Sequence, residues 1–257
     1  MKKKITTVMI VFLGMVIAFC AFMIAKDKIQ RSREISEFED IASIVNSTTA
    51  VDTTGEVAGD NGDYNGSDTE KIPVFKRNLK PIFEKNIDCI GWISIEGTTV
   101  DYPVMYTPAE PQKYLRKNFE GKYSISGVPF MQENCTLESD NIIIYGHNME
   151  NGTMFSDVTA YIDEAYSKKH PTIEFETALG LETYTVFAVA QVKSTDSWYS
   201  FVGASDSDSF DEKIAEICKK ALYVTDVTPE YGQKLLTLST CYGKYDNDRM
   251  IVICVKN

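Results

Sequence analysis

The feature that most constrains the fold is a series of short segments with β-strand character in the C-terminal part of the chain. They are rich in Val, Ile, Tyr and Thr, which favour strands, and few helical stretches interrupt them. Eight strands with few helices predict a mainly β fold, a closed or nearly closed barrel with helices as insertions. The predicted strands are Gly91–Ile95, Thr99–Met105, Val128–Gln132, Asn141–Tyr145, Thr172–Glu176, Thr183–Val192, Lys234–Thr240 and Arg249–Lys256.

Two helical patterns accompany these strands. Apolar residues recur at helical spacing from Phe75 to Phe83, and Pro81 is expected to divide that stretch into two short helices. Nearer the C-terminus, Ser209 and Glu212 have the spacing of a capping box ahead of apolar residues at helical spacing. The second pattern predicts a helix over Ser209–Tyr223.

The sequence of the N-terminal segment predicts a membrane anchor. Three lysines precede a run without charge from Ile5 to Ala25. At 1.5 Å per residue, about 21 residues are enough to cross a hydrocarbon core of roughly 30 Å. The run is longer than the apolar part of a cleaved signal peptide and ends in bulky residues, so residues 1–26 are predicted to be a short cytoplasmic tail and an uncleaved signal-anchor. Basic residues flank both ends, so charge alone does not orient it.

A change of composition separates this segment from the folded domain. Residues 27–45 are charged and compatible with a continuing helix, whereas Thr, Ser, Gly, Asp and Asn dominate 46–70. Such a stretch cannot bury enough apolar surface to offset the entropy of ordering it. We therefore predict a juxtamembrane helix and flexible linker over 27–70 and a folded domain over 71–257.

Charge and cysteine spacing exclude several classes of function. The formal net charge of -11 argues against a nucleic-acid-binding surface. The six cysteines include no CxxC pair, and the acidic residues lack calcium-loop spacing, so no metal or cofactor is predicted. Cys89, Cys135, Cys218 and Cys254 are interpreted as small buried apolar residues.

Cys241 is different because it ends a predicted strand and precedes the turn-like pair Tyr242-Gly243. A thiol at such a junction is held rigidly and stays accessible, but it needs a partner to react near neutral pH. Of the two histidines, His147 also follows an apolar strand directly, and Arg249 opens the strand after Cys241. If those strands pair, the Arg249 guanidinium lies near the thiol and can stabilise a developing oxyanion.

Each of these residues also has a structural interpretation. A lone cysteine is often inert, and a histidine after glycine often serves in a turn. Arg249 has the spacing for an ion pair with Asp246 or Asp248.

Three segments carry a family resemblance. Residues 144–148 (IYGHN), 237–241 (TLSTC) and 249–252 (RMIV) look like the signature blocks of a sortase, and the domain is similar to class B sortases in particular. The helix before the cysteine strand matches a helix that class B members insert there. The likeness runs through residues 71–257 in the same order.

This resemblance implies an eight-stranded sortase-type barrel, preceded by N-terminal helices and the transmembrane anchor, on the outer face of a Gram-positive cell. It implies that Cys241 attacks the Thr carbonyl of a C-terminal sorting signal, and that His147 protonates the leaving amine and later deprotonates an incoming one. Arg249 would stabilise the oxyanion. The implied partners are secreted proteins with a sorting signal and a lipid II-type peptidoglycan precursor amine, with no cofactor.

The resemblance also assigns substrate contacts. Ser239, Leu115, Trp198 and Tyr199 match positions that line the peptide groove or grip the peptide in class B members. For Trp198 and Tyr199 the alternative is local packing against the inserted helix. Two other functions stay open, a pilin-polymerising sortase that uses lysine amines and a non-catalytic, membrane-tethered binding domain.

Overall fold

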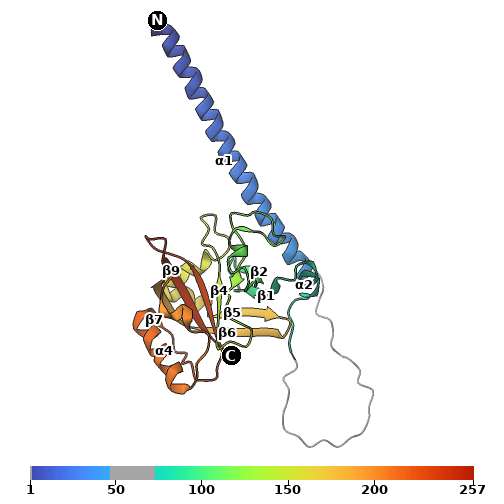
Figure 1. The fold of residues 1–257 in the computed structure, drawn as a ribbon, viewed down its shortest axis with the longest axis vertical. Coiled ribbons are helices and arrows are strands. Elements are labelled where there is room, and N and C mark those ends of the chain that lie inside the picture. The colour runs from blue at the N-terminus through green and yellow to red at the C-terminus, as the bar shows by residue number, and fades with distance from the viewer. Residues whose placement is uncertain (1, 47–72) are drawn as a thin grey trace, which may run out of the picture. The chain divides into compact units, whose positions relative to one another are not determined.

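A computed structural model describes residues 2–46 and 73–257 of the protein (Figure 1). The chain divides into two units, one ending at Asp40 and one running from Ile41 to Asn257. Most of the predicted linker, residues 47–70, lies outside the described residues.

The predicted anchor falls within α1 (Lys2–Asn46), a single continuous helix. Many apolar side chains of its first half are exposed, Phe12, Phe19 and Phe22 among them. In the described part of the chain, no helix has both the length and the apolar character required to cross a membrane.

The second unit is built on one sheet that closes on itself. Of its nine strands, all but β7 (Ala221–Val224) form a ring in the order β5-β1-β2-β3-β4-β8-β9-β6, and β5 pairs with β6 to close it. Removing β7 from the nine leaves the eight-stranded barrel that the sequence predicts (Figure 1). The eight are β1 (Cys89–Ser94), β2 (Asp101–Met105), β3 (Phe130–Met131), β4 (Asn141–Tyr145), β5 (Thr172–Thr177), β6 (Gly180–Lys193), β8 (Leu235–Cys241) and β9 (Asp248–Lys256).

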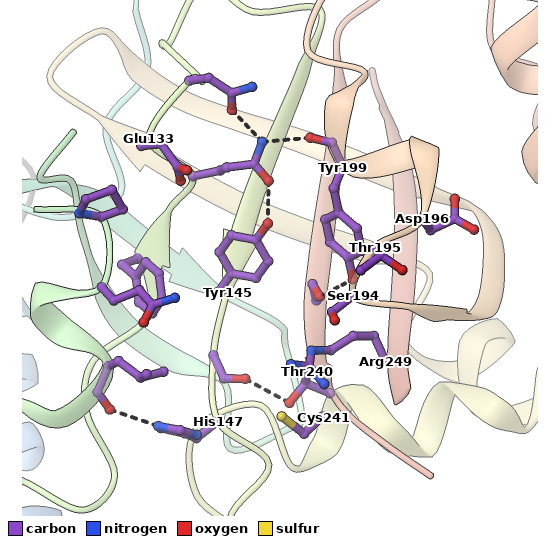
Figure 2. Close-up of a pocket in the computed structure, with 18 of the residues that line it drawn as sticks. Glu133, Tyr145, His147, Ser194, Thr195, Asp196, Tyr199, Thr240, Cys241 and Arg249 are labelled. Carbon is purple, nitrogen blue, oxygen red and sulfur yellow. Dashed lines mark hydrogen bonds between the residues drawn. The ribbon is translucent and has the colours of Figure 1, made fainter. Parts of the chain in front are cut away.

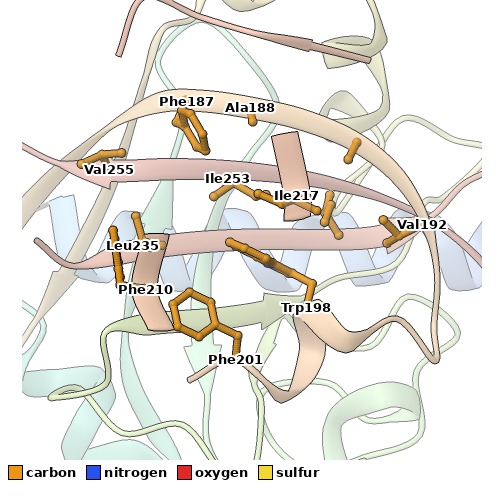
Figure 3. Packing of buried hydrophobic residues seen from close by; sticks show 12 residues of the cluster. Phe187, Ala188, Val192, Trp198, Phe201, Phe210, Ile217, Leu235, Ile253 and Val255 are labelled. Carbon is orange, nitrogen blue, oxygen red and sulfur yellow. The ribbon is translucent and has the colours of Figure 1, made fainter. Parts of the chain in front are cut away.

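The helical insertions are short, except for α4. They are α2 (Lys80–Lys85), η1 (Lys113–Arg116), η2 (Asp157–Ile162), α3 (Glu164–Lys169), η3 (Ser197–Ser200) and α4 (Ser207–Lys220). The amphipathic α4 buries Phe210 and Ile217 against a cluster that includes Phe187 and Leu235 (Figure 3). The barrel and this packed layer carry the segments that form the site.

Two predictions about helices are wrong in detail. The stretch before Pro81 is not helical, because the backbone N–H groups of Lys76 and Arg77 donate to the Glu176 carboxylate at 2.7 and 3.0 Å. These bonds tie residues 76 and 77 to β5.

The helix predicted over Ser209–Tyr223 is α4, but both of its ends differ. The N-cap is Asp206, whose carboxylate accepts from the Ser209 N–H, so Ser209 is the N3 member of the capping box. The helix ends at Lys220 because the residues from Ala221 pair with β6 as β7.

Candidate active site

The three predicted catalytic residues lie at neighbouring strand ends. β8 pairs antiparallel with β9 so that Cys241 is directly opposite Arg249. On the other side of β8, β4 runs parallel to it with Tyr145 opposite Ser239, so both strands end at the same edge. His147 follows two residues after β4 and comes to the same edge as Cys241.

The ends of β4 and β8 are tied together by their own side chains. The Thr240 hydroxyl donates to the carbonyl of Gly146 at 2.8 Å. The Asn148 amide donates in the opposite direction, to the carbonyl of Cys241 at 3.2 Å. These two bonds bracket the segments that carry the thiol and the imidazole. Sequence reasoning missed Asn148, although it lies inside the IYGHN segment.

Gly146 has a packing reason to be glycine. A Cβ atom at this position would lie 2.5 Å from the Phe155 ring, well inside van der Waals contact. Phe155 in turn donates its N–H to the His147 carbonyl at 2.8 Å, which closes the loop that follows the histidine. Glycine at this position therefore allows the chain to pass over the buried Phe155 ring, and this close packing fixes the position of the His147 backbone.

A cavity of about 590 Å³ opens at this edge of the barrel (Figure 2). Its lining includes all three predicted catalytic residues together with Ser239, Leu115 and Tyr199. In Figure 2 the sulfur of Cys241 points into the space between His147 and Arg249.

One wall of the cavity is a polar and aromatic network. The Tyr145 and Tyr199 rings stack with centroids 5.9 Å apart, and the Tyr199 hydroxyl is 2.8 Å from the Ser239 hydroxyl. The Gln132 amide donates to the Tyr199 carbonyl at 2.9 Å, and its oxygen accepts from Tyr145. Burial raises the pKa of Tyr199 to about 12, so this hydroxyl keeps its proton near neutral pH.

The cation and the base have backbone partners. Arg249 Nη1 donates to the carbonyls of Asp246 and Asp248, at 2.6 and 2.9 Å. The sequence had suggested an ion pair with their carboxylates, but the bonds go to the main chain. His147 Nε2 bonds to the Leu115 carbonyl at 2.8 Å. Burial lowers the pKa of His147, although the Leu115 bond opposes the shift.

Cys241 is the exposed thiol of the second unit. Cys89, Cys135 and Cys254 are buried as predicted, and burial raises the pKa of Cys89 to about 12 and of Cys135 to about 11. Cys218 is half-buried rather than buried, which corrects that part of the prediction. Among the described residues, no cluster of three or more His, Cys, Asp or Glu side chains is placed to hold a metal ion.

The family described as Sortase domain matches residues 93–257, more than half of the chain. The chain belongs to the sortase family. It is 30% identical over 178 residues to sortase B of Listeria monocytogenes, an alignment that covers 68% of this chain and 72% of that protein.

Solved structures agree with this assignment. A crystal structure of Staphylococcus aureus sortase B matches with a TM-score of 0.66 and 26% identity, covering 72% of this chain and 88% of that one. A sortase B–substrate complex from the same organism matches with a TM-score of 0.64 and 26% identity, over 70% and 84% of the two chains. This sortase is thus a cysteine transpeptidase that is similar to class B enzymes.

Among the predicted substrate contacts of this sortase, the structure separates Trp198 from the rest. Ser239, Leu115 and Tyr199 line the cavity, whereas Trp198 does not. The Trp198 side chain is 2% exposed and packs in the core with Phe201 (Figure 3). In η3, neighbouring residues therefore face opposite ways, one into the core and one into the site.

Proposed function

We propose that this sortase cleaves a C-terminal sorting signal after a Thr residue and transfers the freed carboxyl end to the amine of a cell-wall peptidoglycan precursor. The observation that carries the proposal is the cavity whose lining combines the Cys241 thiol, the His147 imidazole and the Arg249 guanidinium. Direct pairing of Cys241 with Arg249 puts a cation beside the thiol, where acyl transfer develops negative charge.

The reaction uses these groups in two acyl transfers. The Cys241 thiolate attacks the Thr carbonyl, and Arg249 stabilises the tetrahedral oxyanion. The intermediate collapses to a thioester while His147 protonates the leaving amine. In the second half, His147 takes a proton from the incoming amine, which attacks the thioester and releases Cys241.

The peptide would lie along the wall formed by Tyr199, Ser239 and Leu115. These three side chains lie beside Cys241 in the cavity lining and offer a hydroxyl-bearing aromatic face, a hydroxyl and an apolar surface. The similarity to a sortase B solved in complex with a substrate supports substrate binding by this fold.

The proposed setting is the outer face of the cell membrane, with the protein crossing the bilayer once. The support is the uncharged run from Ile5 to Ala25 and the many exposed apolar side chains within it. A tethered catalytic unit would meet secreted proteins and a lipid-linked wall precursor at the same surface. Membrane fractionation of cells, with protease access from outside, tests this placement.

The activity is tested with the full-length protein and a panel of peptides varied around a Pro-x-Thr core. Mass spectrometry should detect a thioester on Cys241 and cleavage after Thr. Cys241→Ala should abolish both, whereas Cys218→Ala, which removes a half-buried thiol that does not line the cavity, should retain them. Cleavage by the Cys241→Ala variant would refute the proposal.

The acceptor is tested separately, by offering the acyl-enzyme a peptidoglycan-precursor amine or a pilin lysine. Faster transfer to the precursor supports the proposal, and preference for the lysine would favour pilin polymerisation. If no acyl-enzyme forms with any peptide, the non-catalytic binding domain becomes the better interpretation.

A further inference from the structure

The two histidines bind backbone carbonyls through different ring nitrogens. His147 uses Nε2, which lies 2.8 Å from the Leu115 carbonyl oxygen. His170 uses Nδ1, which lies 2.8 Å from the carbonyl oxygen of Glu96. A carbonyl only accepts hydrogen bonds, so in each ring the bonded nitrogen must carry the hydrogen.

This requirement fixes the tautomer of neutral His147. With hydrogen on Nε2, the lone pair belongs to Nδ1. Figure 2 shows the bonded nitrogen turned away from Cys241, whose sulfur points toward the other side of the ring. The nitrogen that faces the reacting sulfur is therefore the one free to exchange a proton.

The Leu115 carbonyl is itself held in place. The preceding residue, Tyr114, is anchored through its hydroxyl, which donates to Asp88 and accepts from Asn86, both at 2.9 Å. Against the other side of this turn lies Gly127, with φ +60; a Cβ there would sit 2.6 Å from the Leu115 and Tyr114 carbonyl oxygens. Only glycine leaves room for the carbonyl that His147 needs.

We propose that the Leu115 carbonyl, kept in place by Gly127, is a positioning group that holds the hydrogen on His147 Nε2 and makes Nδ1 the proton-transferring atom. This inference rests on the proposed function for its catalytic half. The tautomer itself does not depend on any substrate.

The proton balance follows from this arrangement. As Cys241 attacks, its thiol proton passes to Nδ1 and forms the imidazolium. When the first amine leaves, it takes the Nδ1 proton, and the ring keeps the Nε2–H bond to Leu115. When the second amine attacks, Nδ1 takes its proton, and the re-formed imidazolium returns that proton to the released Cys241 thiolate. The Leu115 bond persists through both steps, so the ring need not turn over between them.

The first experiment reads the tautomer directly in the full-length protein. Histidine labelled with ¹⁵N gives signals from only two rings. The spectrum is recorded at about pH 8, where the neutral form of His147 dominates because burial lowers its pKa. We expect hydrogen on Nε2 of His147 and on Nδ1 of His170. The His170 ring is therefore an internal control in which the other nitrogen carries the hydrogen. Hydrogen on Nδ1 of His147, or an even mixture, would overturn the proposal.

The second experiment compares two glycine variants. Gly127→Ala must displace the turn, since bringing its Cβ contact from 2.6 to 3.4 Å takes a shift of about 0.8 Å. Gly121→Ala is the matched control, because Gly121 also has a positive φ, +79, but a Cβ there meets nothing within 4 Å.

Gly127→Ala should lose the Nε2–H preference at His147 and lower kcat on the order of 100-fold while KM changes little. Gly121→Ala should keep the tautomer and kcat. If Gly127→Ala keeps both the Nε2–H tautomer and the wild-type kcat, the positioning role of the Leu115 carbonyl is refuted. If that variant does not fold, the tautomer of His147 in the wild-type protein is the deciding measurement. Absence of an acyl-enzyme from the wild type would instead overturn the proposed function and the proton-transfer role, while the tautomer is still read without turnover.

Discussion

Replacing Trp198 by Phe tests whether this side chain belongs to the core, where the structure puts it, or to the substrate site, where the family resemblance put it. The resemblance assigned this side chain to the substrate, but it is 2% exposed in the core beneath α4. Its indole N–H donates to the Thr237 hydroxyl at 3.1 Å, and that hydroxyl donates to Asn141 at 2.8 Å. Both of these partners are fully buried. The structure therefore predicts a loss of stability rather than a loss of substrate affinity.

The expected cost has two parts. Losing the indole N–H removes one buried hydrogen bond and leaves the Thr237 oxygen short of a donor, about 1 kcal/mol. Shrinking the ring leaves a cavity next to Phe201, whose ring centroid is 5.3 Å from that of Trp198, at about 1–2 kcal/mol. Together these lower the free energy of unfolding by roughly 2–3 kcal/mol.

The assay is urea unfolding of the full-length protein, followed by circular dichroism, with KM for a cleaved peptide measured in the same buffer. A double-mutant cycle with Thr237→Val isolates the hydrogen bond and should give a coupling of about 1 kcal/mol. An unchanged urea midpoint together with a raised KM for Trp198→Phe would refute the core assignment and restore the substrate contact.

Three further predictions concern the site. Gly146→Ala should destabilise the protein and reduce turnover, because its Cβ would lie 2.5 Å from the Phe155 ring, and Gly203→Ala, whose nearest contact is 3.6 Å, should do neither; equal urea midpoints for the two would contradict this. Burial lowers the pKa of His147 below its usual 6.5, so the neutral form favours the fold. Its contribution to stability is then complete above about pH 6.5 and lost as pH falls through the lower folded pKa, so the urea midpoint should drop over that range in the wild type and less in His147→Gln. Tyr199→Phe removes the hydrogen bond at 2.8 Å to the buried Ser239 hydroxyl in the cavity wall. It should raise KM clearly and lower the urea midpoint only slightly; an unchanged KM would count against a peptide on that wall.

The strands were predictable because alternation and β-branched residues are local signals. All eight predicted strands occur, within a few residues of their expected ends. β7 was missed because Ala221 and Leu222 also fit the helical spacing of α4, and only pairing with β6 decides between the two. The N-cap moved to Asp206 for a similar reason, since several Ser and Asp residues in that stretch are suitable caps.

The positions of the three proposed catalytic residues were predictable because each lies at or directly beside the end of a strong strand pattern, and the family resemblance singled them out. The contacts around them were not predictable, because the bonds from Gln132 to Tyr199 and from Asn148 to Cys241 join segments that lie far apart in sequence. Gln132 reaches Tyr199 only because the chain after β3 lies beside η3 in the folded protein. No spacing within a single segment contains that information.

By itself, the sequence determined the eight strands of the barrel and the strand-end positions of Cys241, His147 and Arg249, since both follow from residue type and short-range periodicity. The tertiary structure alone decided that Tyr199 faces the cavity while Trp198 fills the core, and that His147 is held through Nε2. These outcomes depend on which distant segments are brought into contact. Strand pairing and ring closure set those contacts, and they form only when the whole barrel folds.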